Sequence, residues 1–249
     1  MQSEKFNKWF NAFILVGMTV AVVLTTILKT GTSRSADALL IISAIGALTG
    51  VLATVCSANG VILTFLFGLI DVSIYGVMCL INWRNGNAGL GNAILHFCYF
   101  VPMQFVGFFQ WKKRGAEGKS KVKARRLDAR QWALVTLLFA VGSVVAYLII
   151  ARFDKSAADT FIRTAVVLDV LPLMCNIIGQ FLMSTAYMDQ WFFWIGVNVT
   201  SILMWTSSLR TAHDSFTIIY IIKYCFYLIN SINGLRIWMA LSRKEGTCK

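Results

Sequence analysis

Two tryptophans and an asparagine within one apolar stretch carry the clearest chemical signal in this sequence. The stretch reads WFFWIGVN at positions 191–198, so Trp191, Trp194 and Asn198 are three and seven positions apart and share one face of a helix. Trp205 continues that face. Two indole rings and an amide suit a flat aromatic ligand, and a cationic ring gains about 0.5–2 kcal/mol more from an indole face. The alternative for Trp191 is a residue of the interfacial aromatic belt, since it begins a predicted helix.

Polar residues in the last apolar stretch are suited to complete such a site. Lys223, Tyr227 and Asn230 share a face with Gly234 by helical spacing. Asn230 is suited to bond a ribose or an amide group. Lys223 has a second interpretation, because a long side chain can carry its ammonium group outward to the membrane surface.

Two polar residues in the first half of the chain are further candidates for substrate binding. Asp71 lies at the centre of an apolar stretch, and Gln104 stands one turn before Gly107. Polar groups at membrane depth normally face a bundle interior or a water-filled cavity. Asp71 could bind a proton or a cation, accept substrate hydroxyls, or cap a freed backbone donor. The candidate substrate-binding residues are therefore Trp191, Trp194, Asn198, Gln104, Asp71, Tyr227, Asn230 and Lys223.

The sequence contains no catalytic constellation. His96 and His213 fall on different predicted spans or loops, and no nucleophile, phosphate-binding loop or metal motif accompanies them. Five of the six cysteines lie inside apolar stretches, without the spacing of a metal site or of a secreted disulfide framework. We expect no enzymatic activity, no cofactor and no metal, and we interpret the cysteines as reduced packing residues.

The composition requires a membrane around the elements that position these residues. Of the 249 residues 57% are hydrophobic and only 14% are charged, with a mean hydropathy of +0.69, whereas soluble domains carry about 25% charged residues. The net charge of +12 could indicate a nucleic-acid partner. The 23 Lys and Arg residues lie between and beside the apolar stretches, however, so we expect a lipid bilayer and no nucleic acid.

Eight stretches approach the roughly 20 apolar residues that a helix needs to cross the hydrocarbon core. They lie at about 9–28, 39–57, 60–82, 90–111, 132–151, 164–186, 191–209 and 216–240. Pro102 and Pro172 fall inside two of them and should kink those helices by removing a backbone hydrogen bond. The freed carbonyls must then be satisfied within the protein.

The distribution of positive charge predicts the orientation in the membrane. Both termini and the segment 112–130 fall on one side, which carries 15 Lys and Arg residues against seven on the other. Positive segments resist translocation, so this side should be cytoplasmic. We interpret the basic segment as a topology determinant and linker, with an anionic-lipid site as the alternative.

An internal repeat relates the two halves at an offset of 127 residues. Without a gap, Asp71 falls on Asn198, Gly107 on Gly234, Trp111 on Trp238, and Phe65 on Phe192. Corresponding helices are four spans apart and cross in the same direction, as in transporters built from parallel repeats with a central substrate site. The predicted divisions are an extra N-terminal transmembrane helix (1–38), a first three-helix bundle (39–111), a basic cytoplasmic loop with a linking helix (112–163), and a second three-helix bundle with a tail (164–249). The fold class is all-α and integral to the membrane, with a 3+1+3 arrangement after the extra helix.

The motifs QFVGFFQW at 104–111, WFFWIGVN at 191–198 and G-x-x-x-W at 234–238 resemble those of the PnuC family of vitamin transporters, over about four-fifths of the chain. The resemblance implies a SWEET-like fold, a homotrimer, and facilitated diffusion of nicotinamide riboside, which cytoplasmic phosphorylation traps for NAD biosynthesis. It places the substrate-stacking tryptophans at Trp191 and Trp194 and the polar anchor at Asn198, with Gln104 in the matching stretch of the first half. The acidic residue often found just before the first tryptophan is offset here to Asp189.

The sequence therefore predicts an inner-membrane transporter of nicotinamide riboside that works by alternating access. Another cationic or aromatic vitamin, such as thiamine, remains an alternative substrate. A sugar carrier of the SWEET type is a less favoured one, because a clamp of aromatic rings suits a heteroaromatic ring better. A non-transporting membrane receptor or scaffold is the competing class. Truncation of residues 115–125 should separate the two classes, because a scaffold should fail while substrate flux in a transporter should largely survive.

Overall fold

Helices account for nearly all of the regular structure in the computed structural model, which describes residues 2–29, 34–84, 90–118, 120–153, 164–209 and 215–246. The predicted loop with His213 and the tail with Cys248 lie outside these residues. The helices are α1 (Gln2–Lys29), α2 (Arg34–Ala58), α3 (Thr64–Arg84), α4 (Leu90–Leu95), the π-helix η1 (His96–Phe100), α5 (Val101–Lys113), α6 (Ala129–Phe153), α7 (Thr164–Ser184), α8 (Gln190–Leu209) and α9 (Ser215–Gly246).

The all-α membrane fold predicted from the sequence is confirmed. Six segments among the described residues are long and apolar enough to cross a membrane. They are Lys5–Leu28, Ala38–Ala58, Thr64–Ile81, Leu90–Lys113, Ala129–Arg152 and Val166–Ser184. The seventh and eighth predicted stretches form α8 and α9. The observed helix ends differ from the approximate predicted bounds by several residues; α3, for example, begins at Thr64, because residues 59–63 form a turn.

The chain divides into two compact units. Unit 1 comprises Met1–Lys123 together with Ser184–Ala186, and unit 2 comprises Ala124–Met183 and Tyr187–Lys249. The predicted linking helix, α6, belongs to unit 2.

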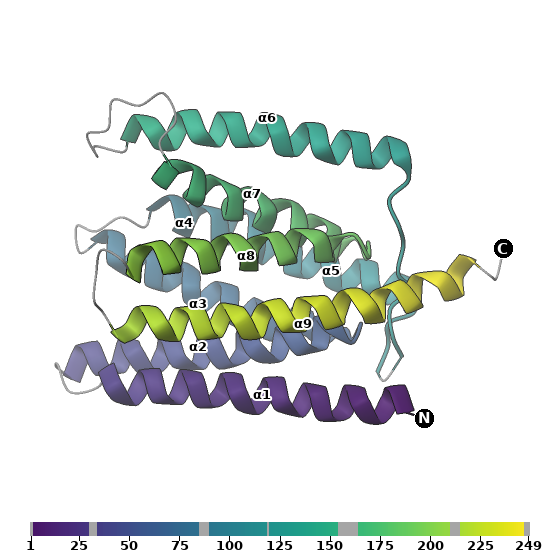
Figure 1. Ribbon diagram of the computed structural model, residues 1–249, viewed down its shortest axis with the longest axis horizontal. Helices are drawn as coiled ribbons and strands as arrows, with labels where there is room; N and C mark the ends of the chain where they lie inside the picture. The colour runs from purple at the N-terminus through teal and green to yellow at the C-terminus, as the bar shows by residue number, and fades with distance from the viewer. Residues whose placement is uncertain are drawn as a thin grey trace. The chain divides into compact units, whose positions relative to one another are not determined.

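In unit 1, α2 packs against both α1 and α3, and α3 packs against the continuous rod of α4, η1 and α5. Figure 1 shows α1 and α2 running side by side. The expected break at Pro102 takes the form of the π-helix His96–Phe100, in which the Val101 N–H donates to the His96 carbonyl. Single π-turns of this kind recur at functional positions in helices.

In unit 2, α6 and α7 share an apolar core, and α8 packs along α9. Val166, Val170, Met174, Ile178 and Leu182 recur every four residues along the buried face of α7, which is the spacing of one helical stripe. Pro172 lies inside α7, and the side chain of Asn176 donates to its carbonyl over 2.8 Å. Figure 1 shows α8 and α9 lying alongside each other.

The turns that precede α3 and α8 have the same hydrogen bonds, which supports the internal repeat. Val61 N–H donates to the Cys56 carbonyl over 2.9 Å, and Tyr187 N–H donates to the Leu182 carbonyl over 2.8 Å. The bonds that start each helix, from residues 64, 65 and 66 to residues 61, 62 and 63, recur at 190, 191 and 192. Every one of these pairs is related by 126 residues.

The ungapped offset of 127 is therefore wrong for this part of the repeat. It is correct in the last helix of each half, where Gly107 and Gly234 each contact an aromatic ring from the preceding spanning helix. That ring belongs to Phe65 in unit 1 and to Trp191 in unit 2, again 126 apart. The second half thus has one extra residue between these helices, and the repeat mate of Phe65 is Trp191 and not Phe192.

The positive φ angle shared by the two turns leads to a stability prediction. Gly60 has φ of 70° and Ala186 has φ of 62°, a region where a Cβ atom costs about 1–2 kcal/mol. We expect Gly60→Ala to lower the free energy of unfolding by about 1 kcal/mol. Ala186→Gly should change it little, because relief of backbone strain is offset by the loss of a buried methyl group. Thermal unfolding of the two variants in detergent checks this; equal destabilisation by both would contradict it.

The basic segment after α5 is not the simple linker predicted from the sequence. Ala116, Val122 and Ala124 are at most 1% exposed, and the Val122 N–H donates to the Gly60 carbonyl over 3.0 Å in unit 1. In unit 2, Met188 N–H donates to the Arg125 carbonyl over 2.8 Å. Deletion of residues 115–125 would remove these buried groups, so it would damage a transporter as well as a scaffold.

Candidate functional site

Trp191 is a packed core residue of unit 2. Its side chain is 2% exposed, and its ring meets the Trp238 ring edge-on at a centroid distance of 6.3 Å. A Cβ atom on Gly234 would lie 2.5 Å from the Trp191 Cη2, so only glycine admits the indole there. A belt residue would expose its ring to lipid, and the structure does not support that interpretation of Trp191.

Trp194, the second tryptophan of the stripe, is only half-buried. Its indole N–H donates to the Gln190 Oε1 over 3.3 Å, and a Cβ on Gly179 of α7 would be in ordinary contact with the ring at 3.4 Å. The ring of Trp194 is therefore oriented by one hydrogen bond and keeps accessible surface. Of the two predicted stacking residues, it is the one whose ring retains more surface for a ligand.

Asn198 connects α8 with α9. It is 5% exposed, and its Nδ2 donates to the Ser231 Oγ over 3.0 Å. Neighbouring polar side chains are also buried, with Ser201 at 3% and Asn230 at 0%. Buried amides and hydroxyls in an apolar bundle require partners, and the Asn198–Ser231 hydrogen bond supplies one such pair between α8 and α9.

Lys223 and Tyr227 form a pair on α9. The Lys223 Nζ lies 5.5 Å from the centroid of the Tyr227 ring, within the range of a cation–π interaction. Tyr224 meets the same ring edge-on at 6.2 Å. The ammonium group therefore contacts an aromatic ring one turn farther into the helix. The structure does not show Lys223 extended away from that ring.

The two candidates from unit 1 pack against glycines. A Cβ on Gly68 would lie 2.7 Å from the Gln104 Oε1, and one on Gly50 would lie 2.8 Å from an Asp71 carboxylate oxygen. Gln104 is 3% exposed. Asp71 is half-buried, with its carboxylate against α2. With the corrected register, the position that Asp71 occupies in α3 corresponds to Val197 in α8, so Asp71 and Asn198 are not repeat mates.

Buried polar atoms without a partner mark both units. Among the described residues, such atoms include Gln104 Oε1 in unit 1 and Gln190 Nε2 and Trp191 Nε1 in unit 2. Each unsatisfied group costs free energy in an apolar medium. Gln190 Nε2 and Trp191 Nε1 are donors at the start of α8, beside the predicted stacking residue Trp194. A polar ligand or ordered water at this point would satisfy them.

Sequence reasoning missed Gln190, Gln180 and Ser201 as buried polar residues. Gln190 could have been recognised from the sequence, because it is an uncharged polar residue immediately before the stripe that begins at Trp191. Asp189 is likewise buried, at 3% exposure, and its Oδ2 accepts a hydrogen bond from the Leu127 N–H over 2.8 Å. The carboxylate thus attaches the segment before α6 to the start of α8. Within the described part of the chain, no group of three or more His, Cys, Asp or Glu residues could hold a metal ion.

Comparison with known proteins finds similar transporters along most of the chain. The family model described as "Nicotinamide mononucleotide transporter" matches residues 40–240. The nicotinamide riboside transporter PnuC of Neisseria mucosa is 33% identical over 209 residues, which cover 82% of this chain and 74% of that protein. The protein of the same name from Haemophilus influenzae is 28% identical over 202 residues, covering 80% of each chain.

The solved structures include a similar protein. A crystal structure of the vitamin B3 transporter PnuC matches with a TM-score of 0.68 and 29% sequence identity. The match covers 94% of this chain and 92% of the other. The fold is thus similar across almost the whole length of both chains.

Proposed function

Because the chain belongs to the PnuC transporter family, we propose that it is a transporter of nicotinamide riboside. One observation carries the proposal: the similarity at 33% identity to a nicotinamide riboside transporter, over most of both chains. The buried aromatic and amide groups of α8 and α9 support it, since they have the chemistry that a flat heteroaromatic nucleoside requires.

The riboside fits the polar groups better than the mononucleotide named in the family description. A phosphate dianion in a low dielectric needs paired cations or many donors. α8 contains no Lys or Arg, and its buried polar side chains are uncharged. A neutral ribose with hydroxyl groups requires only such amides and hydroxyls. We therefore propose that the transported species lacks a phosphate.

The proposed roles follow the surroundings of each residue. Trp194 stacks on the nicotinamide ring, because its indole is oriented by Gln190 and stays partly accessible. Asn198 positions the carboxamide or ribose and is itself held by Ser231. Trp191 supports this region through its packing on Gly234. Gln104, Asp71, Tyr227 and Asn230 remain proposed contributors to substrate binding.

The remaining properties are proposals of the same kind. Transport is facilitated diffusion by alternating access, and phosphorylation in the cytoplasm traps the substrate. The protein catalyses no reaction. It lies in the inner membrane with both termini cytoplasmic, as the charge distribution of the sequence predicts, and it assembles as a homotrimer.

A calorimetric screen of purified protein tests the substrate. Nicotinamide riboside, nicotinamide mononucleotide, thiamine and riboflavin are titrated separately under the same conditions. We expect the riboside to bind at least tenfold more tightly than the mononucleotide, because α8 offers the phosphate no Lys or Arg side chain. Tighter binding of the mononucleotide or of thiamine would overturn the proposed substrate. If none of the four compounds bound, a membrane receptor or scaffold would be the better interpretation.

The charge of Lys223 leads to a prediction about this substrate. The nicotinamide ring of the riboside is a cation, and the Lys223 ammonium already lies over the Tyr227 ring. We expect Lys223→Gln to raise the affinity for the riboside about two- to tenfold. The substitution removes a cation that competes with the nicotinamide ring for the face of the Tyr227 ring. Lys223→Arg is the control and should leave affinity unchanged. Weaker binding by Lys223→Gln would mean that the ammonium group itself contacts substrate.

A further inference from the structure

The described residues that follow α5, 114–118 and 120–123, fold into a small element that we call the basic hairpin. Its ends are joined by two hydrogen bonds, from the Lys123 N–H to the Arg114 carbonyl over 3.1 Å and from the Arg114 Nε to the Lys123 carbonyl over 2.6 Å. Gly115 and Gly118 have φ angles of 81° and 56°, which suit the reversal of the chain. The hairpin is therefore a defined element of unit 1.

The hairpin is attached to unit 1 through its apolar side. Ala116 is 0% and Val122 is 1% exposed, and the Val122 N–H donates to the carbonyl of Gly60. Exposure alternates along the returning segment, with Lys121 and Lys123 exposed on either side of the buried Val122. This is the period of two of an extended strand, and it directs both lysines away from the protein.

Positive charge dominates the outer side of this element. Lys112 and Lys113 at the end of α5 are exposed, as are Lys121 and Lys123. The acidic residue of the hairpin is Glu117, also exposed. The candidate membrane span Leu90–Lys113 ends where the hairpin begins, which places these lysines at the level of the lipid headgroups.

A topology determinant needs only its charge and requires no fixed conformation. In this chain the lysines stand on a hydrogen-bonded hairpin whose apolar residues Ala116 and Val122 are buried, so the backbone that carries them is ordered before any ligand binds. Basic residues immediately beside a membrane span attract anionic lipid headgroups. We propose that the basic hairpin, with the end of α5, is a preformed site for the phosphate headgroups of anionic phospholipids.

The test uses the full chain purified in detergent and titrated with phosphatidylglycerol or with phosphatidylcholine. Binding is followed by the rise in unfolding temperature and by native mass spectrometry of retained lipid. We expect phosphatidylglycerol to bind more tightly than phosphatidylcholine, and the preference to shrink at high salt. Lys121→Gln with Lys123→Gln should weaken phosphatidylglycerol binding about 10- to 30-fold.

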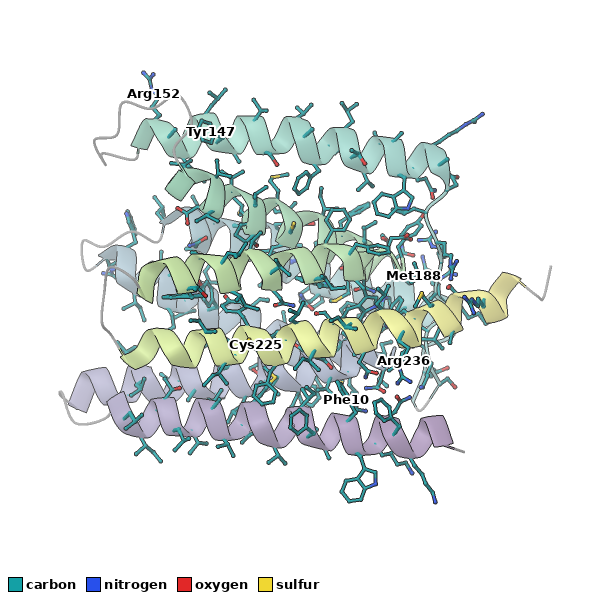
Figure 2. All side chains as sticks on the ribbon, in the orientation of Figure 1. Phe10, Tyr147, Arg152, Met188, Cys225 and Arg236 are labelled. Carbon is teal, nitrogen blue, oxygen red and sulfur yellow. The ribbon has the colours of Figure 1, made fainter. Side chains whose placement is uncertain are left out.

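Two control variants distinguish a specific lipid site from a general effect of net positive charge. Arg84→Gln with Arg152→Gln removes the same charge from the far ends of α3 and α6, and it should retain the lipid preference; Figure 2 labels Arg152 near the end of its helix. Lys121→Arg with Lys123→Arg keeps the charge and should bind as the natural chain does. The double glutamine variant leaves 13 positive residues on the basic side against seven, so its orientation should not change.

Three results would overturn the proposal. The hairpin glutamine variant could bind phosphatidylglycerol as well as the natural chain does. The Arg84 and Arg152 variant could lose the preference equally. Glycerol phosphate could compete at the same concentration as the lipid, which would mean a site for free phosphate. The lipid measurements need no transport, so they are independent of the proposed substrate.

Discussion

Gly234→Ala should lower the free energy of unfolding by about 1–3 kcal/mol, the usual effect of overpacking a core. The added Cβ would lie within 2.5–2.7 Å of three atoms of the Trp191 ring, and real contacts of that length are excluded. The indole cannot move freely, because Trp191 and Trp238 are both almost completely buried and their rings are in contact. Thermal unfolding in detergent measures the change.

Gly91→Ala is the matched control, because nothing lies within 4 Å of the position of its added Cβ. In an open helical site, alanine is favoured over glycine by roughly 0.5–1 kcal/mol. The two glycine-to-alanine changes should therefore have opposite signs. Gly107→Ala, which would press on the Phe65 ring, should behave like Gly234→Ala. A neutral result at Gly234 would contradict the close packing of α8 on α9.

Trp194→Ala should reduce the affinity for nicotinamide riboside roughly tenfold or more, because a cationic ring stacked on indole gains about 0.5–2 kcal/mol beyond its buried area. The indole that the substitution removes is half-buried and is oriented by its bond to Gln190. Calorimetry with purified protein gives the dissociation constant. The fold should survive, since the ring is not fully enclosed.

Trp9→Ala is the control for Trp194→Ala. Trp9 lies near the start of α1 and is 79% exposed, so its removal should leave the affinity unchanged. Gln190→Leu adds a second comparison, since it removes the acceptor of the Trp194 N–H while it keeps the ring. We expect an intermediate loss there. If Trp194→Ala kept the natural affinity within a few tenths of a kcal/mol, the assigned stacking residue would be wrong.

The helices and the repeat could be predicted from the sequence because both depend on the types and the spacing of residues. Apolar stretches of about 20 residues specify membrane spans, and the Gly107 and Gly234 motifs aligned correctly. The register of Trp191 could not be predicted, because one extra residue somewhere between two helices leaves no pattern of its own. The turn hydrogen bonds and the contacts of Phe65 and Trp191 with glycine reveal it.

The conformation of the basic segment was also beyond sequence reasoning. Its many charges and two glycines are typical of a solvated linker. The features that order it are long-range contacts, such as the bond from Val122 to Gly60 and the bond from Leu127 to Asp189. For the candidate site, the stripe identified Trp194 and Asn198. The packing role of Trp191 depends on a glycine 43 positions later in the sequence.

Uptake of labelled nicotinamide riboside into liposomes that contain only the purified chain tests the central claim most directly. We predict saturable uptake that stops when the inner and outer concentrations are equal, that needs no ion gradient, and that Trp194→Ala reduces strongly. Uptake no faster than in empty liposomes, from protein shown to be folded by its unfolding transition, would contradict the account. Accumulation above the outer concentration that collapses with a proton gradient would contradict facilitated diffusion and direct attention to Asp71.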